Sequence, residues 1–417
     1  MNDNIKLGKT SRIVDKCQIS DSDNLVSVLF LGFHPPVNNY IKIGEQATEQ
    51  PSYPCELIYC PDSNLVQLGL IVDPKILFPS EYPYTSGTTK LLRDNFAELY
   101  QETTTILDLE KDDLVIDIGS NDGTLLSNFQ HKHRVLGVTP EEIGQLAIKK
   151  GIPTIIDYFN QGVVDQILSK FGKAKVITAT NVFAHIDDAN KITQLISSLL
   201  KDDGVFISES HYLGSLIETL QYDTIYHEHL RYYSLSSLKY LLDQNRLNIF
   251  HAKTIPTHGG SIRVYATKDS NFEVEESISR ILQEEEKSIS LDGLMKFKQD
   301  VLGSKLKLLS LLKNIKSQGH RIFGIGSPSR ASTLINYTGL DSDIIECIVE
   351  VEGSYKIGKY MPGTRIPVLE ESILYGKQPE YAVLFSWHIA DELIPKIRDK
   401  GYTGKFIVPL PDPQVIT

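Results

Sequence analysis

The tetrapeptide Tyr226-His227-Glu228-His229 places a phenol, two imidazoles and a carboxylate at four successive positions. An imidazole titrates near neutral pH, and a neighbouring carboxylate can fix its tautomer and raise its basicity. The spacing of the two histidines differs from the helical H-E-x-x-H pattern, so a zinc hydrolase is a weak interpretation of this motif. The motif instead predicts a proton-transfer site, and a surface loop that carries chance histidines is the alternative.

A glycine-bounded turn at residues 115–126, with the sequence VIDIGSNDGTLL, provides a second candidate site. The apolar residues at 114–118 suit a buried strand of a parallel sheet, and Gly119 and Gly123 let the backbone turn sharply beside a ligand. The spacing differs from the dinucleotide pattern G-x-G-x-x-G and matches the first motif of S-adenosylmethionine-dependent methyltransferases better. The turn therefore predicts a nucleotide-cofactor site, and the alternative is a helix start that is capped by a polar side chain.

Strands alternate with segments of helix length between residue 113 and about residue 250, which is typical of βαβ units and a doubly wound parallel sheet. The expected strands are 114–118, 134–138, 154–156, 175–179 and 204–208. Ligands of such sheets bind beyond the carboxyl ends of the strands. Asn181 and His185 follow the fourth strand, so we expect them to face the same crevice as the glycine-bounded turn.

The flanking segments predict two further parts of the chain. The N-terminal segment contains short apolar runs broken by Pro and Asn, residues 276–318 predict a solvated pair of helices, and a second strand-turn-helix pattern occupies 321–330. We therefore expect an α/β protein with three parts. They are a small N-terminal β-rich module at 1–80, a central Rossmann-like domain with a doubly wound sheet at 81–255, and a C-terminal second Rossmann-like α/β domain at 256–417.

The composition of the 417-residue chain argues against several classes of protein. Its net charge of −11 disfavours a general nucleic-acid surface, which needs clustered Lys and Arg. No apolar run approaches about 18 residues, and the polar N-terminus is not followed promptly by an apolar segment, so we expect no membrane span, no signal peptide and a cytoplasmic location. Four cysteines in a chain of this length do not make a disulfide framework, and Cys347 is expected in the core.

Six motifs, taken in order, resemble the sugar C-methyltransferases of deoxysugar pathways. They are YPYTS at 82–86, DIGSNDGTLL at 117–126, TNVFAHI at 180–186, YHEH at 226–229, HGGSIR at 258–263 and GIGS at 324–327, and they span nearly the whole chain. The resemblance implies an N-terminal zinc-binding module, a central methyltransferase domain and a C-terminal Rossmann-like domain that contacts a sugar nucleotide. It also implies S-adenosylmethionine as cofactor and methylation at C3 of a nucleotide-linked 4-keto-6-deoxy sugar, with dTDP or GDP as the nucleotide.

The same resemblance assigns roles to individual residues. A ketone at C4 acidifies the C3 proton, so a positioned base can form an enolate, and His229 is the expected base. Glu228 would orient His229 or hold a sugar hydroxyl, while Tyr226 and His185 would contact the sugar or its developing oxyanion. The residues expected to bind the cofactor are Tyr82, Tyr84, Gly119, Ser120, Asn121, Asp122, Gly123, Thr139 and Asn181, and those expected to bind the substrate are His258, Arg263, Ser327 and Arg330.

The N-terminal module departs from the family pattern of two Cys-x-x-Cys pairs. The corresponding tetrapeptides are CQIS and CPDS, so Ser20 and Ser63 replace two of the four thiolates. Serine is a poor zinc ligand, and structural zinc normally needs four N or S donors. Cys55 or His34 could substitute in principle, but the simpler interpretation is that the metal has been lost. We therefore predict no metal site.

Two further positions depart from the family pattern. Methyltransferases usually place an acid after the second strand to bind the ribose hydroxyls, whereas Thr139 occupies this place here and is followed by Pro140, Glu141 and Glu142. A hydroxyl can hydrogen-bond ribose without charge assistance, which predicts weaker cofactor affinity. The turn SPSR, which ends at Arg330, differs from the usual Ala-rich form with a lysine, and Arg330 is expected to meet a diphosphate.

The sequence is also compatible with two alternatives to a methyltransferase. An NAD(P)-dependent sugar-nucleotide oxidoreductase would use one of the glycine-rich turns, but neither turn completes G-x-G-x-x-G and no clear acid ends the second strand. In a catalytically inactive nucleotide-binding scaffold, no function would constrain the identities of Tyr226, Glu228, His229 and His185. The presence of these residues therefore argues against this alternative. The expected partner is thus a nucleotide-linked 4-keto-6-deoxy sugar, without nucleic acid or membrane, and the expected state is a monomer.

Overall fold

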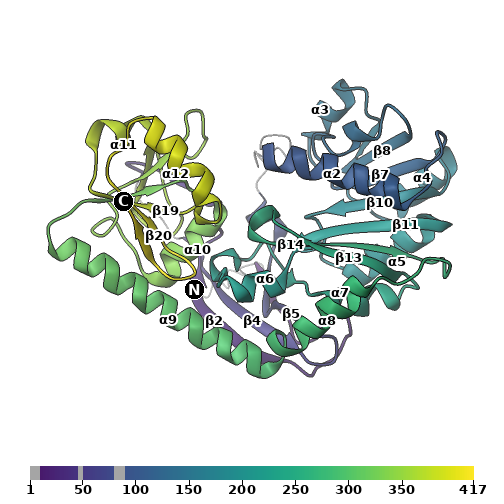
Figure 1. Ribbon diagram of the computed structural model, residues 1–417, viewed down its shortest axis with the longest axis horizontal. Coiled ribbons are helices and arrows are strands. Elements are labelled where there is room, and N and C mark those ends of the chain that lie inside the picture. Colours follow the sequence, from purple (N-terminus) through teal and green to yellow (C-terminus); the bar gives the residue numbers. More distant parts are fainter. Residues whose placement is uncertain (1–9, 46–49, 79–89) are drawn as a thin grey trace, which may run out of the picture.

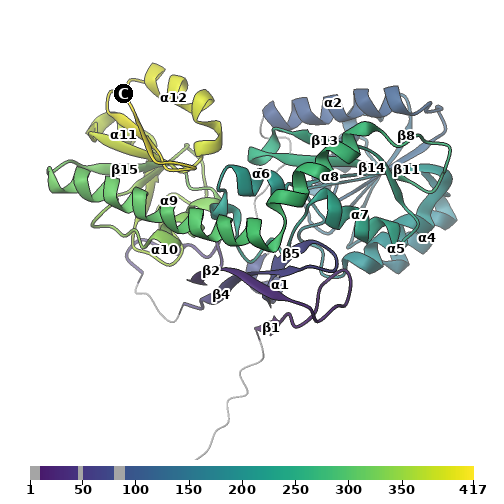
Figure 2. The ribbon, with the colours of Figure 1, turned by 60° about the horizontal axis from the view of Figure 1, so that its bottom comes forward.

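A computed structural model describes residues 10–45, 50–78 and 90–417 of the chain. Figure 1 shows two α/β bodies side by side, one formed by the central part of the chain and the other by its C-terminal part. The purple strands of the N-terminal part lie beneath these bodies in Figure 2. The expected α/β class, with a β-rich N-terminal module and two Rossmann-like parts, is confirmed by the strand order.

The central sheet has seven strands in the order β13-β14-β11-β10-β7-β8-β9. The five strands expected from the sequence run parallel to one another. They are β7 (Leu114–Ile118), β8 (Arg134–Thr139), β9 (Thr154–Ile156), β10 (Ala174–Thr180) and β11 (Leu200–His211). Two antiparallel strands, β13 (Asn248–Ile255) and β14 (Ser261–Thr267), complete the sheet. Because β14 pairs with β11, this sheet extends past the expected domain boundary after residue 255.

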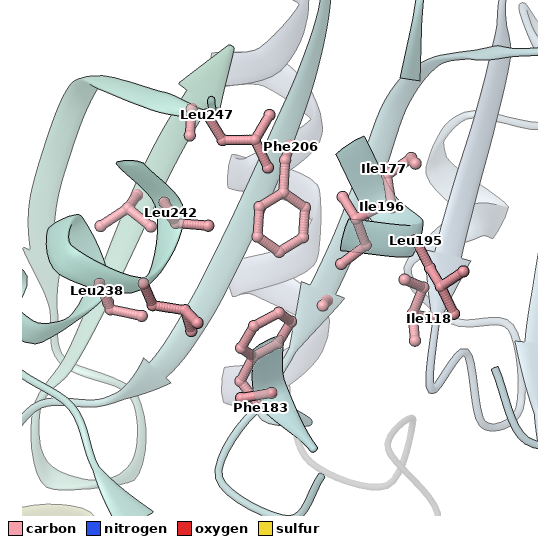
Figure 3. Close-up of a cluster of buried hydrophobic side chains, with 14 of the residues drawn as sticks. Ile118, Ile177, Phe183, Leu195, Ile196, Phe206, Leu238, Leu242 and Leu247 are labelled. Carbon is pink, nitrogen blue, oxygen red and sulfur yellow. The ribbon is translucent and has the colours of Figure 1, made fainter. Parts of the chain in front are cut away.

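Helices cover both faces of the central sheet, which explains why its parallel strands are apolar throughout. In β7, Val115 packs on the side of α2 (Lys90–Ile106), and the next residue, Ile116, packs on the opposite side. Figure 3 shows the second side, where Phe206 lies between α7 (Leu235–Asp243) and α5 (Ala189–Leu199). Burying a side chain of this size contributes roughly 1.5–3 kcal/mol. The other elements of this part are α3 (Gly144–Lys149), α4 (Gln161–Lys170), α6 (Leu213–Glu218), η2 (Leu126–Asn128), η3 (Tyr222–Thr224) and η4 (Thr257–Gly259).

The N-terminal part forms a four-stranded antiparallel sheet in the order β12-β5-β4-β2. Its strands are β2 (Val26–His34), β4 (Tyr53–Cys60), β5 (Leu65–Leu68) and β12 (Arg231–Tyr232). The N-terminal part also contains β1 (Ser11–Ile13), β6 (Leu70–Val72) and the short helix α1 (Pro74–Leu77). The edge strand β12 comes from the central part of the chain and closely follows the YHEH motif. The N-terminal sheet therefore anchors the C-terminal end of the loop that carries the YHEH motif, which is the predicted proton-transfer site.

The C-terminal part is built on an eight-stranded sheet in the order β21-β20-β19-β15-β16-β18-β17-β3. Its parallel strands are β15 (Ile322–Ile325), β16 (Ile348–Glu350), β18 (Pro367–Glu370), β19 (Tyr381–Leu384) and β20 (Lys405–Val408). The antiparallel strands are β17 (Lys359–Tyr360), β21 (Gln414–Ile416) and β3 (Ile41–Lys42). Since β3 belongs to the N-terminal part, that part contributes strands to this sheet, to the four-stranded sheet and to a separate two-stranded sheet of β1 and β6. Cys347 lies in the core of this body, as expected.

A long helix connects the central and C-terminal bodies. The expected helix pair is α8 (Glu276–Ser288) and α9 (Leu291–Ser317), and α9 runs beneath the C-terminal body in Figure 1. The other helical elements are α10 (Ser329–Thr338), α11 (Ser372–Lys377), α12 (Ala390–Asp399) and η5 (Trp387–Ile389). Over the residues that the structure describes, none of the helices has the length and apolar character of a membrane span.

Candidate active site

His229 lies in the turn between η3 and β12. Its Nδ1 is 3.0 Å from the carbonyl oxygen of Thr224. Because a carbonyl oxygen only accepts, Nδ1 carries the hydrogen and donates it, which leaves the lone pair on Nε2. Burial, together with the nearby imidazoles of His185 and His211, holds the pKa of His229 well below its usual range. His229 is therefore a neutral imidazole whose basic nitrogen is Nε2.

Two other residues of the expected catalytic set surround this ring. The ring centroids of Tyr226 and His185 lie 4.3 and 5.1 Å from that of His229. His185 Nδ1 donates to the backbone carbonyl of Glu228 at 2.7 Å, so the lone pair of His185 is also on Nε2. Burial lowers the pKa of His185. The structure thus brings Tyr226, His185 and His229 together from two separate segments of the chain.

Glu228 is held by a residue of the N-terminal part. Glu228 is 4% exposed, and its carboxylate accepts a hydrogen bond from the side-chain amide of Asn38 at 2.7 Å. The side-chain oxygen of Asn38 accepts in turn from the hydroxyl of Tyr355 in the C-terminal part, at 3.3 Å. Three parts of the chain therefore meet at Glu228. Asn38 is not predicted from the sequence, because no local pattern around it indicates a role.

The loop that carries the motif rests on the N-terminal sheet. Leu68 donates its backbone N–H to the carbonyl of Leu230 at 3.0 Å, beside the pairing of β12 with β5. His227 packs against Tyr53, and its Nε2 lies 3.2 Å from the carbonyl oxygen of Pro54. Burial lowers the pKa of His227 to about 4. His227 therefore anchors the loop to the N-terminal sheet, whereas His229 faces the other imidazoles.

The glycine-bounded turn follows β7 at the carboxyl edge of the central sheet. Gly119, Asn121 and Gly123 all have positive φ angles, of 75°, 48° and 77°. A Cβ atom on Gly119 would collide with a methyl group of Val182. A Cβ atom on Gly123 would lie 2.8 Å from the Cβ of Ala147. Both conformation and space therefore require glycine at these two positions.

Polar side chains of this turn approach β8 and the residues that follow it. The hydroxyl of Ser120 is buried and has no hydrogen-bond partner within the described part of the chain. Asp122 is 4% exposed and pairs with Lys150 at 3.3 Å. Asn121 donates its side-chain amide to Glu141 at 3.3 Å. A buried hydroxyl without a partner and a carboxylate at this edge of a parallel sheet fit the polar groups of an adenosyl cofactor.

Thr139 occupies the position at which the family pattern has an acid. An acidic residue, Glu141, follows two positions later. Thr139 is 2% exposed, whereas Glu141 is exposed and reaches the turn through Asn121. Glu141 follows Asn121 by 20 positions, which is close to the spacing at which nucleotide-binding folds place an acid for ribose. This spacing is the signal in the sequence that could have indicated Glu141.

The other expected cofactor residues are Asn181, Tyr82 and Tyr84. Asn181 follows β10 with a φ of 57° and donates its backbone N–H to the carbonyl of Glu209 at 2.8 Å. It therefore lies at the same edge of the sheet as the glycine-bounded turn. Tyr82 and Tyr84 lie outside the described residues.

Two of the expected substrate residues have their polar atoms engaged within the chain. Arg263 is fully buried in β14 and forms ion pairs with Glu209 and Glu102. Ser327 is also fully buried, and its backbone N–H and hydroxyl both donate to Glu350, at 2.9 and 2.6 Å. A substrate contact at either residue would break a buried polar interaction. Both residues therefore have polar partners within the chain, and their contact with the substrate stays a prediction.

Arg330 also has its polar atoms engaged within the chain. Its guanidinium donates two hydrogen bonds to the carboxylate of Asp223, both at 2.8 Å, and lies 4.8 Å from the ring centroid of Trp387. Arg330 thus makes a bidentate contact with Asp223, and its contact with a diphosphate stays a prediction. Burial and the positive charge of Arg330 lower the pKa of His258. His258 itself has a φ of 56°.

The four positions that correspond to the family's zinc ligands lie together in the N-terminal part. Cys17 Sγ is 3.2 Å from the hydroxyl of Ser63, and Cys60 Sγ is 3.6 Å from the hydroxyl of Ser20. Two thiols and two hydroxyls do not fit the N and S donors of a structural zinc site. In the described ranges no three His, Cys, Asp or Glu side chains form a group that could hold a metal ion.

The two substitutes considered for the missing thiolates lie elsewhere. Cys55 Sγ donates to the carbonyl of Ile225 at 3.6 Å, and His34 Nε2 lies 2.9 Å from the carbonyl of Leu31. Burial raises the pKa of the Cys55 thiol to about 12, which disfavours a thiolate. Neither residue completes a set of zinc ligands.

The strand order and the glycine-bounded turn define a Rossmann-like methyltransferase. Three family descriptions match successive parts of the chain. They are "Putative zinc binding domain" at residues 17–78, "Methyltransferase domain" at 89–252 and "C-methyltransferase C-terminal domain" at 256–411.

A curated relative extends this similarity over the whole chain. The C-methyltransferase NovU of Streptomyces niveus is 30% identical over 412 residues, which cover 97% of this chain and 98% of the relative. The chain therefore belongs to the S-adenosylmethionine-dependent C-methyltransferases.

Similar solved structures cover less than half of the chain. Magnesium protoporphyrin IX methyltransferase from Synechocystis PCC 6803, with bound S-adenosylmethionine, covers 42% of this chain and 79% of its own, with 15% identity and a TM-score of 0.33. The PH0226 protein from Pyrococcus horikoshii OT3 covers 47% of this chain and 98% of its own, with 13% identity and a TM-score of 0.36. At these TM-scores neither structure adds an argument on function.

Proposed function

We propose that this C-methyltransferase adds a methyl group to C3 of a nucleotide-linked 4-keto-6-deoxy sugar, and that His229 removes the C3 proton. The observation that carries the proposal is the state of His229. Its Nδ1 is fixed as a donor by the carbonyl of Thr224, and burial keeps the ring neutral, so Nε2 is ready to accept a proton. Because the lowered pKa also weakens this base, proton removal requires a carbon acid such as the C3–H that the neighbouring ketone acidifies.

The residues around His229 suit the other demands of enolate formation. When the C3 proton moves to Nε2, negative charge develops on the C4 oxygen. Tyr226 and His185 are the nearest ring neighbours of His229 with polar atoms, so we assign them to the sugar and its developing oxyanion. Glu228 is anchored by Asn38, and we assign its carboxylate to a sugar hydroxyl.

The turn after β7 is assigned to the cofactor. Ser120, Asn121 and Asp122 offer polar groups between two required glycines, and Asn181 lies at the same edge of the sheet. When bound, S-adenosylmethionine would supply the methyl group, which passes from its sulfonium sulfur to the enolate carbon and leaves the neutral thioether S-adenosylhomocysteine. Asn121 and Glu141 would hold the cofactor at this edge, which lies next to the strand that leads to His185.

The experiment incubates the full-length protein and S-adenosylmethionine with a panel of dTDP- and GDP-linked 4-keto-6-deoxy sugars, and analyses the products by mass spectrometry. We expect a mass gain of one CH₂ unit for one nucleotide series, with the new carbon at C3 by NMR. Exchange of the C3 hydrogen with deuterium from D₂O is measured in parallel, because it reports proton removal alone.

Variants of histidine separate the base from the rest of the site. His229→Ala should abolish both methylation and C3 exchange while S-adenosylmethionine still binds by calorimetry. His131→Ala, at an exposed histidine, is the matched control and should behave as wild type. Normal C3 exchange in the His229→Ala variant would contradict the role of His229. Binding of NADH in place of S-adenosylmethionine would favour the oxidoreductase alternative.

A further inference from the structure

Arg231 is a buried cation that links the two segments of the chain that carry His185 and His229. It lies in β12, closely follows His229 in sequence and is 1% exposed. Its backbone pairs with Gln67 of β5, so the N-terminal sheet fixes its place. Its guanidinium extends from that sheet to the turn at 183–187, which follows β10 and carries His185.

The guanidinium donates to three backbone carbonyls of this turn. They belong to Phe183, Ile186 and Asp187, and the distances are 3.3, 2.6 and 2.6 Å. The oxygen of Ile186 accepts from both terminal nitrogens of the guanidinium. One planar fork thus gathers carbonyls from both ends of the turn. An ammonium group has one nitrogen and lacks this fork, so a lysine at this position could not hold all three carbonyls in the same way.

These three acceptors are neutral, although the guanidinium carries a full charge. Taking a charged group out of water costs far more free energy than taking out a neutral one, and hydrogen bonds must offset that cost. Apolar side chains of similar volume often replace buried ionic groups without loss of stability. Stability therefore does not explain an arginine at position 231, whereas the geometry that its fork imposes on the turn does.

Two further hydrogen bonds join the same two segments. Leu230 donates its backbone N–H to the carbonyl of Ala184 at 2.8 Å. In the other direction, His185 Nδ1 donates to the backbone carbonyl of Glu228 at 2.7 Å. With the guanidinium contacts, these bonds hold the turn and the motif loop side by side. The ring centroids of His185 and His229 are 5.1 Å apart in this arrangement.

We propose that Arg231 is a positioning residue of the methyl-transfer reaction, and that it acts by fixing the imidazole of His185 against that of His229. The inference rests on the proposed function, in which His229 removes the C3 proton and His185 meets the charge that develops on the C4 oxygen. C3 and C4 are bonded to each other, so the two imidazoles must address adjacent atoms in the same transition state. A displacement of about 1 Å in such a group can cost about 100-fold in rate.

Arg231→Lys in the full-length protein tests the inference, because it keeps the buried charge and removes the fork. We expect kcat for methylation and the rate of C3 exchange with D₂O to fall about 100-fold. KM for the sugar nucleotide and the affinity for S-adenosylmethionine, measured by calorimetry, should stay close to wild type, since Arg231 is assigned no contact with either ligand. Arg280→Lys, at an exposed arginine of α8, is the matched control and should leave all four quantities unchanged.

A double-variant cycle separates the positioning of His185 from a general structural role. His185→Gln removes the imidazole that Arg231 is proposed to hold. If Arg231 acts through His185, the variant with both changes should exchange the C3 hydrogen as fast as His185→Gln does. Independent effects would multiply, and a multiplied loss of rate would overturn the inference.

NMR of the histidine ring nitrogens gives a readout that needs no sugar. We expect the signals of His185 and His229 to move in Arg231→Lys, because the separation of the two rings changes. The signal of His320, which stacks on Tyr381 in the C-terminal part, should stay where it is. Unchanged signals of His185 and His229 would overturn the inference.

Two further outcomes keep the inference apart from the proposed function. If the wild type methylates no sugar of the panel, the proposed function fails, and movement of the His185 and His229 signals in Arg231→Lys still supports the positioning of the two rings. If Arg231→Lys no longer binds S-adenosylmethionine, Arg231 supports the central part of the chain as a whole. That result would overturn a specific positioning role.

Discussion

Asn38 and Glu228 lie 190 positions apart in the sequence, and the amide of the first donates to the carboxylate of the second at 2.7 Å. The same asparagine accepts from Tyr355, so one side chain joins the three parts of the chain at the candidate active site. The β12 strand and the contact of His227 with Pro54 hold the motif loop on the same N-terminal sheet. The N-terminal part therefore holds the YHEH loop in place through contacts that do not involve the substituted zinc positions.

Replacing Asn38 tests this positioning role. A hydrogen bond to a charged group contributes about 1.5–3 kcal/mol, so Asn38→Ala should lower kcat roughly 10- to 100-fold if the bond is needed in the transition state. The affinity for S-adenosylmethionine, measured by calorimetry, should stay unchanged. Asn39→Ala, at the adjacent exposed residue, is the control. Equal kcat values for the two variants would remove Asn38 from the positioning of Glu228.

The pH dependence of C3 exchange reports the state of His229. The lowered pKa means that the free base is fully present above the ordinary histidine value of about 6.5 and is lost only when the pH falls well below it. At saturating substrate, we expect the exchange rate to stay level from pH 8 to about pH 6 and to fall at lower pH. An unshifted imidazole would lose half of its base form at about pH 6.5. A midpoint at or above that value would show that His229 is not held neutral by burial.

Glu141 is expected to supply the acid that Thr139 does not. We expect Glu141→Gln to weaken S-adenosylmethionine binding about 10-fold, because a charge-assisted hydrogen bond to ribose becomes a neutral one. Glu142→Gln is the matched control, since it removes the same charge one position later. Calorimetry with the 2′-deoxy analogue of S-adenosylhomocysteine identifies the contact, because the variant and the wild type should bind that analogue equally. A weakening that persists with the analogue would place Glu141 away from the ribose 2′-hydroxyl.

The elements that the sequence predicted well are those with local patterns. The apolar run at 114–118 and the glycines that follow it gave the strand and turn at β7, and the helix pair at 276–318 follows from its periodicity. The motif around His229 was found because its residue types are concentrated in four positions. Each of these signals lies within a short window of sequence.

The features that the sequence did not reveal depend on distant partners. Arg330 carries the charge expected for a diphosphate, but its partner is Asp223, 107 positions earlier. Arg263 is likewise paired with Glu209 across β14 and β11. No local pattern shows whether an arginine faces a ligand or a buried carboxylate. The pairing of β12 with β5 was hidden for the same reason, because two residues carry too little periodicity to indicate a strand.

The substituted zinc positions lead to a gain-of-function prediction. Since Cys17 lies 3.2 Å from Ser63 and Cys60 lies 3.6 Å from Ser20, the double change Ser20→Cys and Ser63→Cys would place four thiols together. We expect that variant to contain one zinc per chain by elemental analysis, and wild type to contain none. Zinc at 100 times its dissociation constant stabilises a folded protein by about 2.7 kcal/mol, so a chelator should lower the unfolding temperature of the variant only.

The single variants serve as controls for the double variant. Ser20→Cys and Ser63→Cys each provide three thiols, so each should bind zinc more weakly than the pair. One zinc per chain in the wild type would show that hydroxyl or other ligands complete the site after all. Absence of zinc from the double variant would show that the four side chains do not converge as the sulfur–oxygen distances indicate. Either result would require a different account of how this module stays folded under the motif loop.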